Sequence, residues 1–317
     1  MAGKTRVPFS LLAALLLALG AVWLVTHFLR ENPVDPVNPL SHLAAPPDWD
    51  QLQAYQGTMS RREFEDLLLN VYTIGERWKE FITLDDSAAT IRTDFRDPAK
   101  SVRLAFSSED HLTPPRMWRP ASTLPPPPPG QPLDGLKIAI DPGHIGGEFA
   151  RMEARWFQIG EQSPVMEGEM ALLTARHLKP LLEQMGASVE LVRKDNRPVT
   201  TATPQDFAAY AAERLPAATP EEHRRLATRL FYRTAQIRAR ARIINETIKP
   251  DLVLCLHFNA EDWGGDPSSP RLSNRNHFHL LLNGAYTPGE VARDDERFAM
   301  ISRILQRTHS EELALAR

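Results

Sequence analysis

Residues 136–144 read LKIAIDPGH, so a short apolar run stops at a Pro-Gly turn and leads directly into His144. A short apolar run bounded by turn residues predicts a buried β-strand. Residues 252–256 read LVLCL, the kind of run that is buried on both faces of a parallel sheet, and His257 follows it. Functional groups of open α/β sheets gather beyond the carboxyl ends of the strands. We therefore expect both histidines at one edge of a sheet.

Helical patterns alternate with these strands. Residues 169–185 have apolar side chains at helical spacing, with Pro180 inside the segment and Gly186 at the position where a glycine commonly follows a helix. Alternation of strands and helices predicts an α/β fold of three layers (α/β/α), with a mixed, mostly parallel sheet covered on both faces. The same patterns predict further strands at 189–192 and 277–282 and further helices at 226–248 and 291–305.

The composition excludes several classes of protein. The 317 residues suggest about two domains. Lys and Arg number 37 against 40 Asp and Glu, a net charge of −3, which argues against a nucleic-acid partner. Seven arginines between residues 224 and 242 are interpreted as a solvated helix face with some buried pairing. Cys255 is the only cysteine, so any metal must be held by His, Asp or Glu.

The N-terminal segment is typical of a signal anchor or a signal peptide. Residues 9–29 contain no charged side chain, and Lys4 and Arg6 precede them. An uncharged apolar stretch of this length can cross a bilayer, and the positive flank stays inside. We therefore expect an exported protein of the periplasm or cell envelope, anchored in the inner membrane through residues 9–29 if the segment is not cleaved.

Proline-rich stretches divide the rest of the chain. Residues 48–110 are predicted to be a small α+β region with a structural or partner-docking role, in which Ser60 and Glu63 form a capping box that opens a helix. Five consecutive prolines at 125–129 favour an extended spacer. The expected organisation is a signal segment at 1–30, a proline-rich spacer at 31–47, the α+β region at 48–110, a proline-rich linker at 111–135 and an α/β domain at 136–317.

Two histidines and a glutamate are the candidate metal ligands. Glu167 lies just before the helix that returns from the first strand, which places it at the same sheet edge as His144 and His257. Three such ligands with a fourth position open are typical of catalytic zinc, which suits amide hydrolysis. Other readings remain open. Each histidine can be structural, Glu169 competes for the ligand role, and His277 and His279 form another possible pair.

Several segments occur in the order of one family's motifs. They are Asp141-Pro142-Gly143-His144, Glu167 with Leu172, the strand-containing segment 186–197, Arg240 with Asn245, and Leu256-His257-Phe258-Asn259-Ala260. Together they resemble the zinc-dependent N-acetylmuramoyl-L-alanine amidases of bacterial cell walls, over about residues 136–317. The resemblance implies a mixed six-stranded sheet and hydrolysis of the amide between N-acetylmuramic acid and L-alanine in peptidoglycan by zinc-activated water. His144, Glu167 and His257 match the Zn2+ ligands. Asn259, just after the third ligand, lies where it can contact substrate or orient the site.

The chain departs from the family pattern at four places. The loop at 145–149 lacks a glycine directly after His144, the stretch at 150–166 is longer and more aromatic, and residues 198–222 are an insertion. The fourth departure concerns the general base, a glutamate on a late strand of the family domain. We expect this catalytic residue beyond Arg317, in a longer chain. The alternative is a domain that lacks its general base. Glu148 and Glu261 are not supported by the resemblance.

Two other functions compete with the amidase. One is a catalytically inactive amidase-like domain that binds peptidoglycan or an envelope regulatory protein. The other is a related exported zinc peptidase or amidohydrolase. An envelope protein without a metal is the remaining alternative.

Overall fold

The computed structural model describes residues 46–109, 113–116, 118–258, 265–266, 269, 271, 274–282 and 284–316. None of the helices in these ranges has the length and apolar character needed to cross a bilayer. The predicted signal segment at 1–30 and nearly all of the spacer at 31–47 lie outside the described residues.

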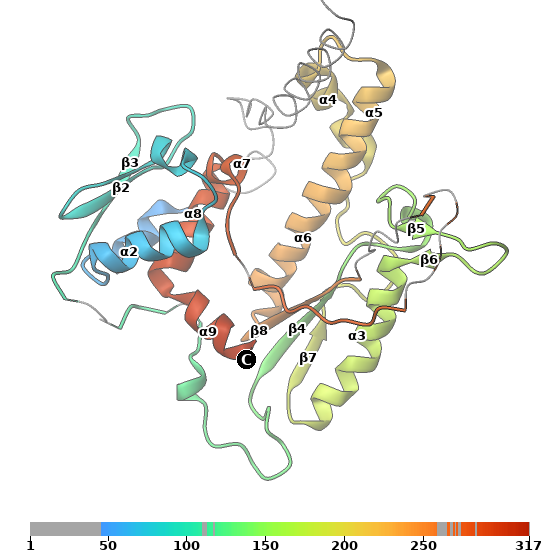
Figure 1. Ribbon diagram of the computed structural model, residues 1–317, viewed down its shortest axis with the longest axis horizontal. Coiled ribbons are helices and arrows are strands. Elements are labelled where there is room, and N and C mark those ends of the chain that lie inside the picture. The colour runs from blue at the N-terminus through green and yellow to red at the C-terminus, as the bar shows by residue number, and fades with distance from the viewer. Residues whose placement is uncertain are drawn as a thin grey trace, which may run out of the picture.

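A parallel sheet forms the centre of the second half of the chain (Figure 1). Strand β4 (Lys137–Pro142) lies between β7 (Ser188–Leu191) and β8 (Leu252–Leu256), and both neighbours run parallel to it. Ile140 is in register with Leu191 on one side and with Leu254 on the other. The predicted α/β class with a parallel sheet is therefore confirmed. The register also brings the carboxyl ends of β4 and β8 together.

Helices cover both faces of this sheet. Helix α3 (Glu167–Gln184) packs Ala175 against Ile138 and Val189 on one face. On the other face, Ile248 packs with Ala139 and Val192. Ile248 ends one long helical stretch, which confirms the helix predicted at 226–248. Its successive segments are α5 (Pro220–Arg229), η8 (Leu230–Ala235), α6 (Gln236–Arg242) and η9 (Ile243–Ile248).

The insertion at 198–222 folds back against this long helix. It contains η7 (Pro204–Phe207) and α4 (Ala208–Arg214). Phe207 and Ala211 pack with Phe231 and with Ile145, the residue that follows His144. The insertion therefore helps to bury the loop that carries the first candidate ligand.

An antiparallel sheet with the order β1-β2-β3 belongs to the first half of the chain. Its strands are β1 (Ile82–Leu84), β2 (Ala88–Arg92) and β3 (Ser101–Ala105). Helix α2 (Arg61–Leu67) begins where the sequence predicts, because the Ser60 side chain accepts a hydrogen bond from the Glu63 backbone N–H. The region also contains two short 3-10 helices, η2 (Trp49–Tyr55) and η4 (Arg77–Glu80), and a π-helical turn, η3 (Leu68–Tyr72), that continues α2.

The C-terminal helices pack on this first region, at the left of Figure 1. They are α7 (Pro288–Val291), α8 (Asp294–Gln306) and α9 (Thr308–Leu315). Met300 and Ile304 of α8 share a core with Phe64 and Ile91. The sequence correctly predicts a helix near 291–305 but assigns it to the domain at 136–317. Helical spacing shows that one face is buried and not which core receives that face.

The strand predicted at 277–282 is not formed. These residues have no regular secondary structure, and the side chains of Phe278 and Leu281 are 82% and 86% exposed. An apolar run becomes a strand only when a neighbouring strand satisfies its backbone groups. Within the described ranges, this segment is paired with no strand.

A buried arginine joins helix α8 to strand β2 of the antiparallel sheet. The fully buried Arg297 side chain on α8 donates hydrogen bonds to the carbonyl oxygens of Arg92 (2.8 Å) and Val291 (2.8 Å) and to Asp294 (2.6 Å).

We predict that Arg297→Met lowers the free energy of unfolding by about 2–4 kcal/mol, because it leaves these acceptors without their partner. Urea unfolding measures this, and Arg293→Met at the start of the same helix is the control. Its expected change is below about 1 kcal/mol because the Arg293 side chain pairs with Glu296 in a partly exposed position. Equal losses in the two variants would contradict the prediction.

The proline-rich linker is tied to the start of the parallel sheet. Asp251 accepts hydrogen bonds from the Arg119 side chain (2.8 and 3.1 Å) and from the Lys137 backbone N–H (2.8 Å). Burial alone would raise the pKa of Asp251, but these bonds outweigh it and lower the pKa below the usual 3.8.

We predict that Asp251→Asn destabilises the protein by about 1 kcal/mol at neutral pH. Because the folded-state pKa is lowered, the difference from the native chain should be constant from pH 7 to about pH 5 and should shrink as the pH falls below about 4. Urea unfolding across this range measures it. Asp86→Asn is the control, since the Asp86 side chain is almost fully exposed. A difference that grows on acidification would refute the assignment.

Candidate metal centre

The parallel ladder places the two histidines side by side. Pro142 is in register with Leu256, and the Gly143 N–H donates to the Leu256 carbonyl oxygen at 2.8 Å. His144 and His257 therefore leave neighbouring strands at the same edge. A Cβ atom at position 143 would lie 2.4 Å from the His257 ring, so this turn needs glycine.

Glu167 reaches the same edge as the first residue of α3. Its backbone N–H donates to the Arg155 carbonyl oxygen at 3.2 Å. The next residue, Gly168, packs so closely on the loop after His144 that a Cβ atom there would lie 2.4 Å from the Gly146 nitrogen. This contact brings the first turn of α3 against the histidine loop.

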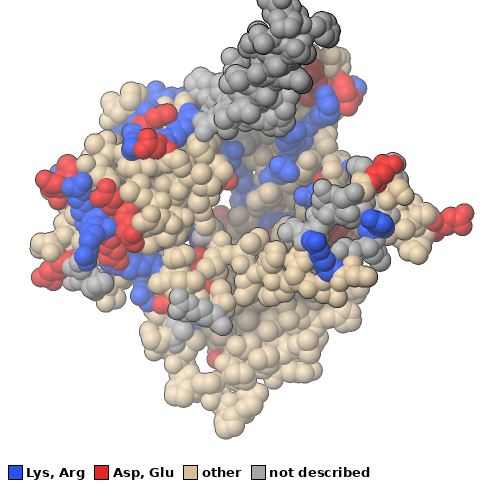
Figure 2. Space-filling model, in the orientation of Figure 1, with Lys and Arg blue, Asp and Glu red and all other residues tan. Residues whose placement is uncertain are grey.

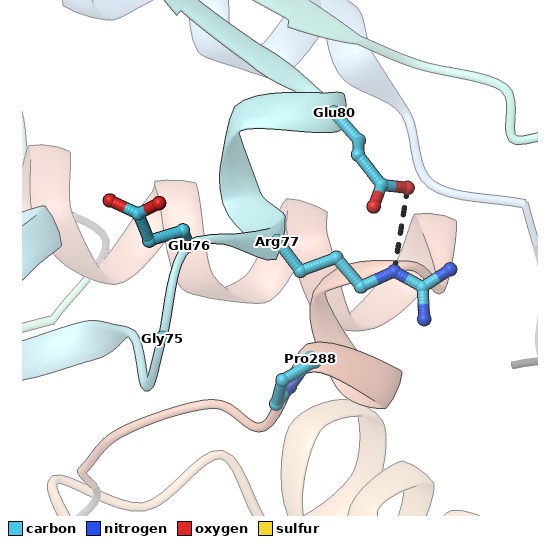
Figure 3. A pocket seen from close by; sticks show the side chains of 5 residues that line it. All are labelled: Gly75, Glu76, Arg77, Glu80 and Pro288. Atoms are coloured by element: carbon cyan, nitrogen blue, oxygen red, sulfur yellow. Dashed lines mark ion pairs between the residues drawn. The ribbon is translucent and has the colours of Figure 1, made fainter. Parts of the chain in front are cut away.

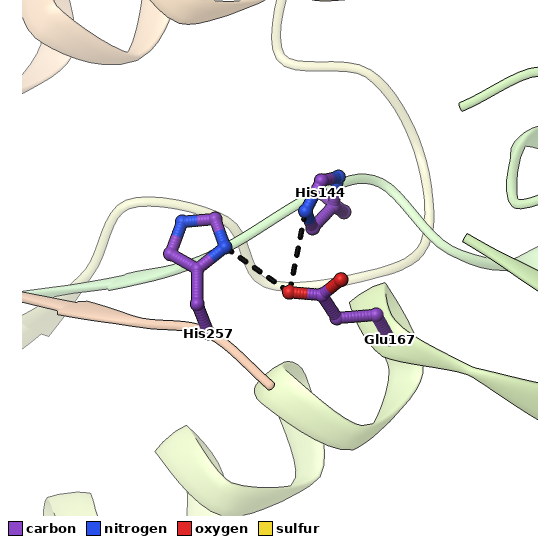
Figure 4. Close-up of side chains that lie close together, drawn as sticks. All are labelled: His144, Glu167 and His257. Carbon is purple, nitrogen blue, oxygen red and sulfur yellow. Dashed lines mark hydrogen bonds and ion pairs between the residues drawn. The ribbon is translucent and has the colours of Figure 1, made fainter. Parts of the chain in front are cut away.

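The three side chains point toward one another (Figure 4). Glu167 Oε1 lies 3.3 Å from His144 Nε2 and 3.1 Å from His257 Nδ1. One ligand atom from each residue lies within 4.8 Å of the others. Ligand atoms about 2.0–2.1 Å from a tetrahedral zinc ion are about 3.3 Å apart. The donor set and its spacing therefore fit a metal ion, with two imidazoles and one carboxylate as ligands.

The electrostatics of the cluster favour the charged carboxylate. Burial alone would raise the pKa of Glu167, but its interactions with His144 and His257 and a hydrogen bond from the Phe258 backbone N–H outweigh it and hold the pKa far below its usual range. Burial would lower the pKa of His144, but the neighbouring carboxylates of Glu153 and Glu167 outweigh that effect and raise it. The cluster therefore offers an ionised carboxylate, the form that binds metals.

Two buried arginines shape the loop that carries His144. His144 has a left-handed backbone conformation with φ of 57°, which is uncommon for a residue with a side chain. Arg240 of α6 donates to its carbonyl oxygen, to the Pro142 carbonyl oxygen (2.6 Å) and to Asp141 (2.8 Å). These bonds hold the strained turn in place.

Arg193 ties the same turn to α3. Its guanidinium donates to the carbonyl oxygens of Gly168 (2.7 Å) and Gly143 (3.4 Å) and is almost completely buried. Burial lowers the pKa of Arg193 to about 10, so the side chain remains cationic at neutral pH. The turn before His144 and the helix that begins at Glu167 are therefore held by one side chain.

A buried carboxylate faces the other ring nitrogen of His144. Glu153 is 5% exposed, and its Oε1 lies 3.6 Å from His144 Nδ1. Its second oxygen accepts from the backbone N–H groups of Ile145 (2.9 Å) and Gly146 (3.4 Å). A carboxylate in this position favours a proton on Nδ1 and leaves the Nε2 lone pair directed at the ligand cluster.

The competing sequence candidates lie elsewhere. Glu169 accepts a hydrogen bond from the Asn196 side chain at 3.2 Å and takes no part in the cluster. His277 and His279 are exposed, with ring centroids 4.6 Å apart, and belong to no three-ligand group among the described residues. Asn259 and Glu261 lie outside the described residues.

Sequence reasoning missed Glu153 and assigned no role to Arg155, Arg193 or Arg240. Arg193 lies in the segment 186–197, and Arg240 belongs to the motif formed with Asn245. The order of these motifs along the chain was the signal available for both arginines. Glu153 and Arg155 lie in the longer stretch at 150–166, which contains a loop and the short strands β5 (Trp156–Phe157) and β6 (Val165–Met166). No periodic pattern marks which side chains of such a loop turn inward.

The surface carries two further features. Figure 2 shows Lys and Arg side chains following the long helix. Arg240 and Arg238 of this helix pair with Asp141 and Asp295, so the arginine-rich stretch does combine an exposed face with buried pairing.

A pocket lies between η4 and α7, where Arg77 and Glu80 pair at 3.4 Å (Figure 3). Its lining residues include no nucleophile and no metal-ligand group of three.

Comparisons with known proteins add no relative. No family model matches the chain, and the searches of curated proteins and of solved structures found no match.

We predict that Glu153→Gln weakens metal binding by about 10- to 100-fold, the usual effect of losing a carboxylate behind a ligating histidine. A glutamine cannot accept from His144 Nδ1 and from both backbone N–H groups as the carboxylate does. Zinc affinity measured by competition with a chromophoric chelator tests this. Glu148→Gln, an exposed residue of the same loop, is the control. Unchanged affinity in Glu153→Gln would show that Glu153 does not orient the ligand.

Proposed function

We propose that this protein is an exported zinc hydrolase that cleaves the amide bond between N-acetylmuramic acid and L-alanine in peptidoglycan. The observation that carries the proposal is the convergence of His144, Glu167 and His257 at the carboxyl edge of a parallel sheet. The motif order described above supports this substrate class over other amides. The proposal includes the family's full architecture, a mixed six-stranded sheet between helix layers.

The residues of the chain have distinct parts in this activity. A zinc ion held by the three ligands would supply Lewis acidity toward the scissile carbonyl and toward water. Glu167 is largely buried beneath the histidines, whereas about half of the His257 side chain is exposed. Substrate would therefore approach from the His257 side. We assign the general base to none of the described residues.

The location of the protein is part of the same proposal. The apolar segment at 9–29, with its positive flank, supports export to the periplasm or cell envelope. Peptidoglycan is then the accessible polymer, and an envelope regulatory protein is the expected class of partner.

The first experiment measures zinc stoichiometry of the chain and of His144→Ala, Glu167→Ala and His257→Ala. About one zinc per chain, lost in each variant, is expected because catalytic sites rarely tolerate loss of one of three ligands. Glu169→Ala is the matched control, a glutamate two residues away that should keep its zinc. Zinc binding that is retained in Glu167→Ala but lost in Glu169→Ala would show that Glu169, and not Glu167, is the second ligand.

Purified sacculi then distinguish the functions. Release of stem peptides with a free L-alanine amino group supports the amidase. Zinc binding together with retention on sacculi and no cleavage, in a chain that includes its natural C-terminus, would favour the peptidoglycan-binding module. Cleavage of other exported amides without action on sacculi would favour the related peptidase.

A further inference from the structure

A guanidinium group contacts two of the three candidate ligands. Arg155 Nε lies 3.0 Å from Glu167 Oε2 and donates to His144 Nε2 at 3.3 Å. The Arg155 side chain is 42% exposed, so it spans from solvent to the ligand cluster. Its charge faces the ligand atoms from the side of the 150–166 loop.

The backbone holds Arg155 in this place. Its N–H donates to the Ala150 carbonyl oxygen at 2.8 Å, and its carbonyl oxygen accepts from the Glu167 N–H at 3.2 Å. Strand β5 begins at the next residue, Trp156, which is in register with Met166, the residue before Glu167. The arginine is therefore fixed to the start of α3, and its approach to the ligands is built into the hairpin.

The hydrogen bond to His144 has a direct consequence for metal binding. Glu153 favours the tautomer with a proton on Nδ1, which leaves one lone pair on Nε2. That lone pair serves one partner at a time, either the Arg155 N–H or a metal ion. The contact of Arg155 with Glu167 likewise neutralises charge that would otherwise attract a cation.

We propose that Arg155 competes with the metal ion for His144 and Glu167 and thereby sets the metal affinity of the site. The inference rests on the proposed function, since it concerns the same three ligands. Metal binding requires the guanidinium to leave His144 Nε2. Because the hairpin keeps Arg155 attached beside α3, the displaced positive charge stays near and opposes the dication.

Arginine remains protonated over the whole accessible pH range. Its competing charge is therefore present at every pH at which zinc affinity is measured. The zinc dissociation constants are compared at about pH 8.5, where proton competition at an ordinary histidine is small.

The test compares zinc dissociation constants of the full chain after stripping with a chelator, using competition with a chromophoric chelator. Arg155→Gln is expected to bind zinc about tenfold or more tightly than the native chain. Arg155→Met, which keeps the aliphatic stem, is made in parallel and should show the same tightening, so a folding defect in one variant does not decide the result. Arg151→Gln is the control, because it removes a positive charge from the same loop at a side chain that stacks on Trp156 at 3.4 Å. Its zinc dissociation constant should stay close to that of the native chain.

Each outcome decides the inference. Unchanged affinity in folded Arg155 variants overturns it, and weaker binding does so too, since Arg155 would then support the ligands. If the native chain binds one zinc and the Arg155 variants show unchanged or weaker binding, the inference about Arg155 fails but the proposed function stands. Zinc bound by none of the proteins overturns both. Zinc bound only after Arg155 is replaced supports the competition strongly.

Discussion

Arg240 holds the carboxyl end of β4 in the conformation on which the candidate site depends. From the long helix it binds the Asp141 carboxylate and the carbonyl oxygens of Pro142 and His144. This fixes a strained turn against the parallel ladder to β8, which in turn places His257 next to His144. An arginine can do this because its planar guanidinium offers several donors in a fixed arrangement. Helix, turn and sheet edge are coupled through one buried cation.

Three arginines surround the ligand cluster with different consequences. Arg193 and Arg240 are buried and donate hydrogen bonds to carbonyl oxygens and, from Arg240, to the Asp141 carboxylate, so they stabilise the turn. Arg155 is partly exposed and bonds to the ligand atoms themselves. Glu153 and Glu167 supply the balancing negative charge. The first two arginines hold the turn in place, and we propose that the third lowers the metal affinity of the site.

Part of this arrangement could be predicted because it depends on element ends. His144 and His257 each follow a short apolar run that predicts a strand, and parallel pairing then brings them together. The expectation that residues 252–256 are buried on both faces is wrong, because Val253 and Cys255 of β8 are exposed. Spacing alone did not decide between Glu167 and Glu169, and the family resemblance favoured Glu167. Residues two apart on a helix point in different directions, and the packing of α3 against the histidine loop decides which one faces the cluster. Glu153 and Arg155 belong to a loop without periodicity.

The sequence by itself determined the local elements: the strands of the parallel sheet, helix α3 and the long helix to Ile248, because apolar spacing and turn residues act within a few positions. The tertiary structure alone decided that α8 enters the core of the first region and that residues 277–282 form no strand among the described residues. It also decided which charges meet at the ligands. These outcomes depend on contacts between segments far apart in the chain, where burial and hydrogen-bond satisfaction select one partner among many chemically equivalent ones.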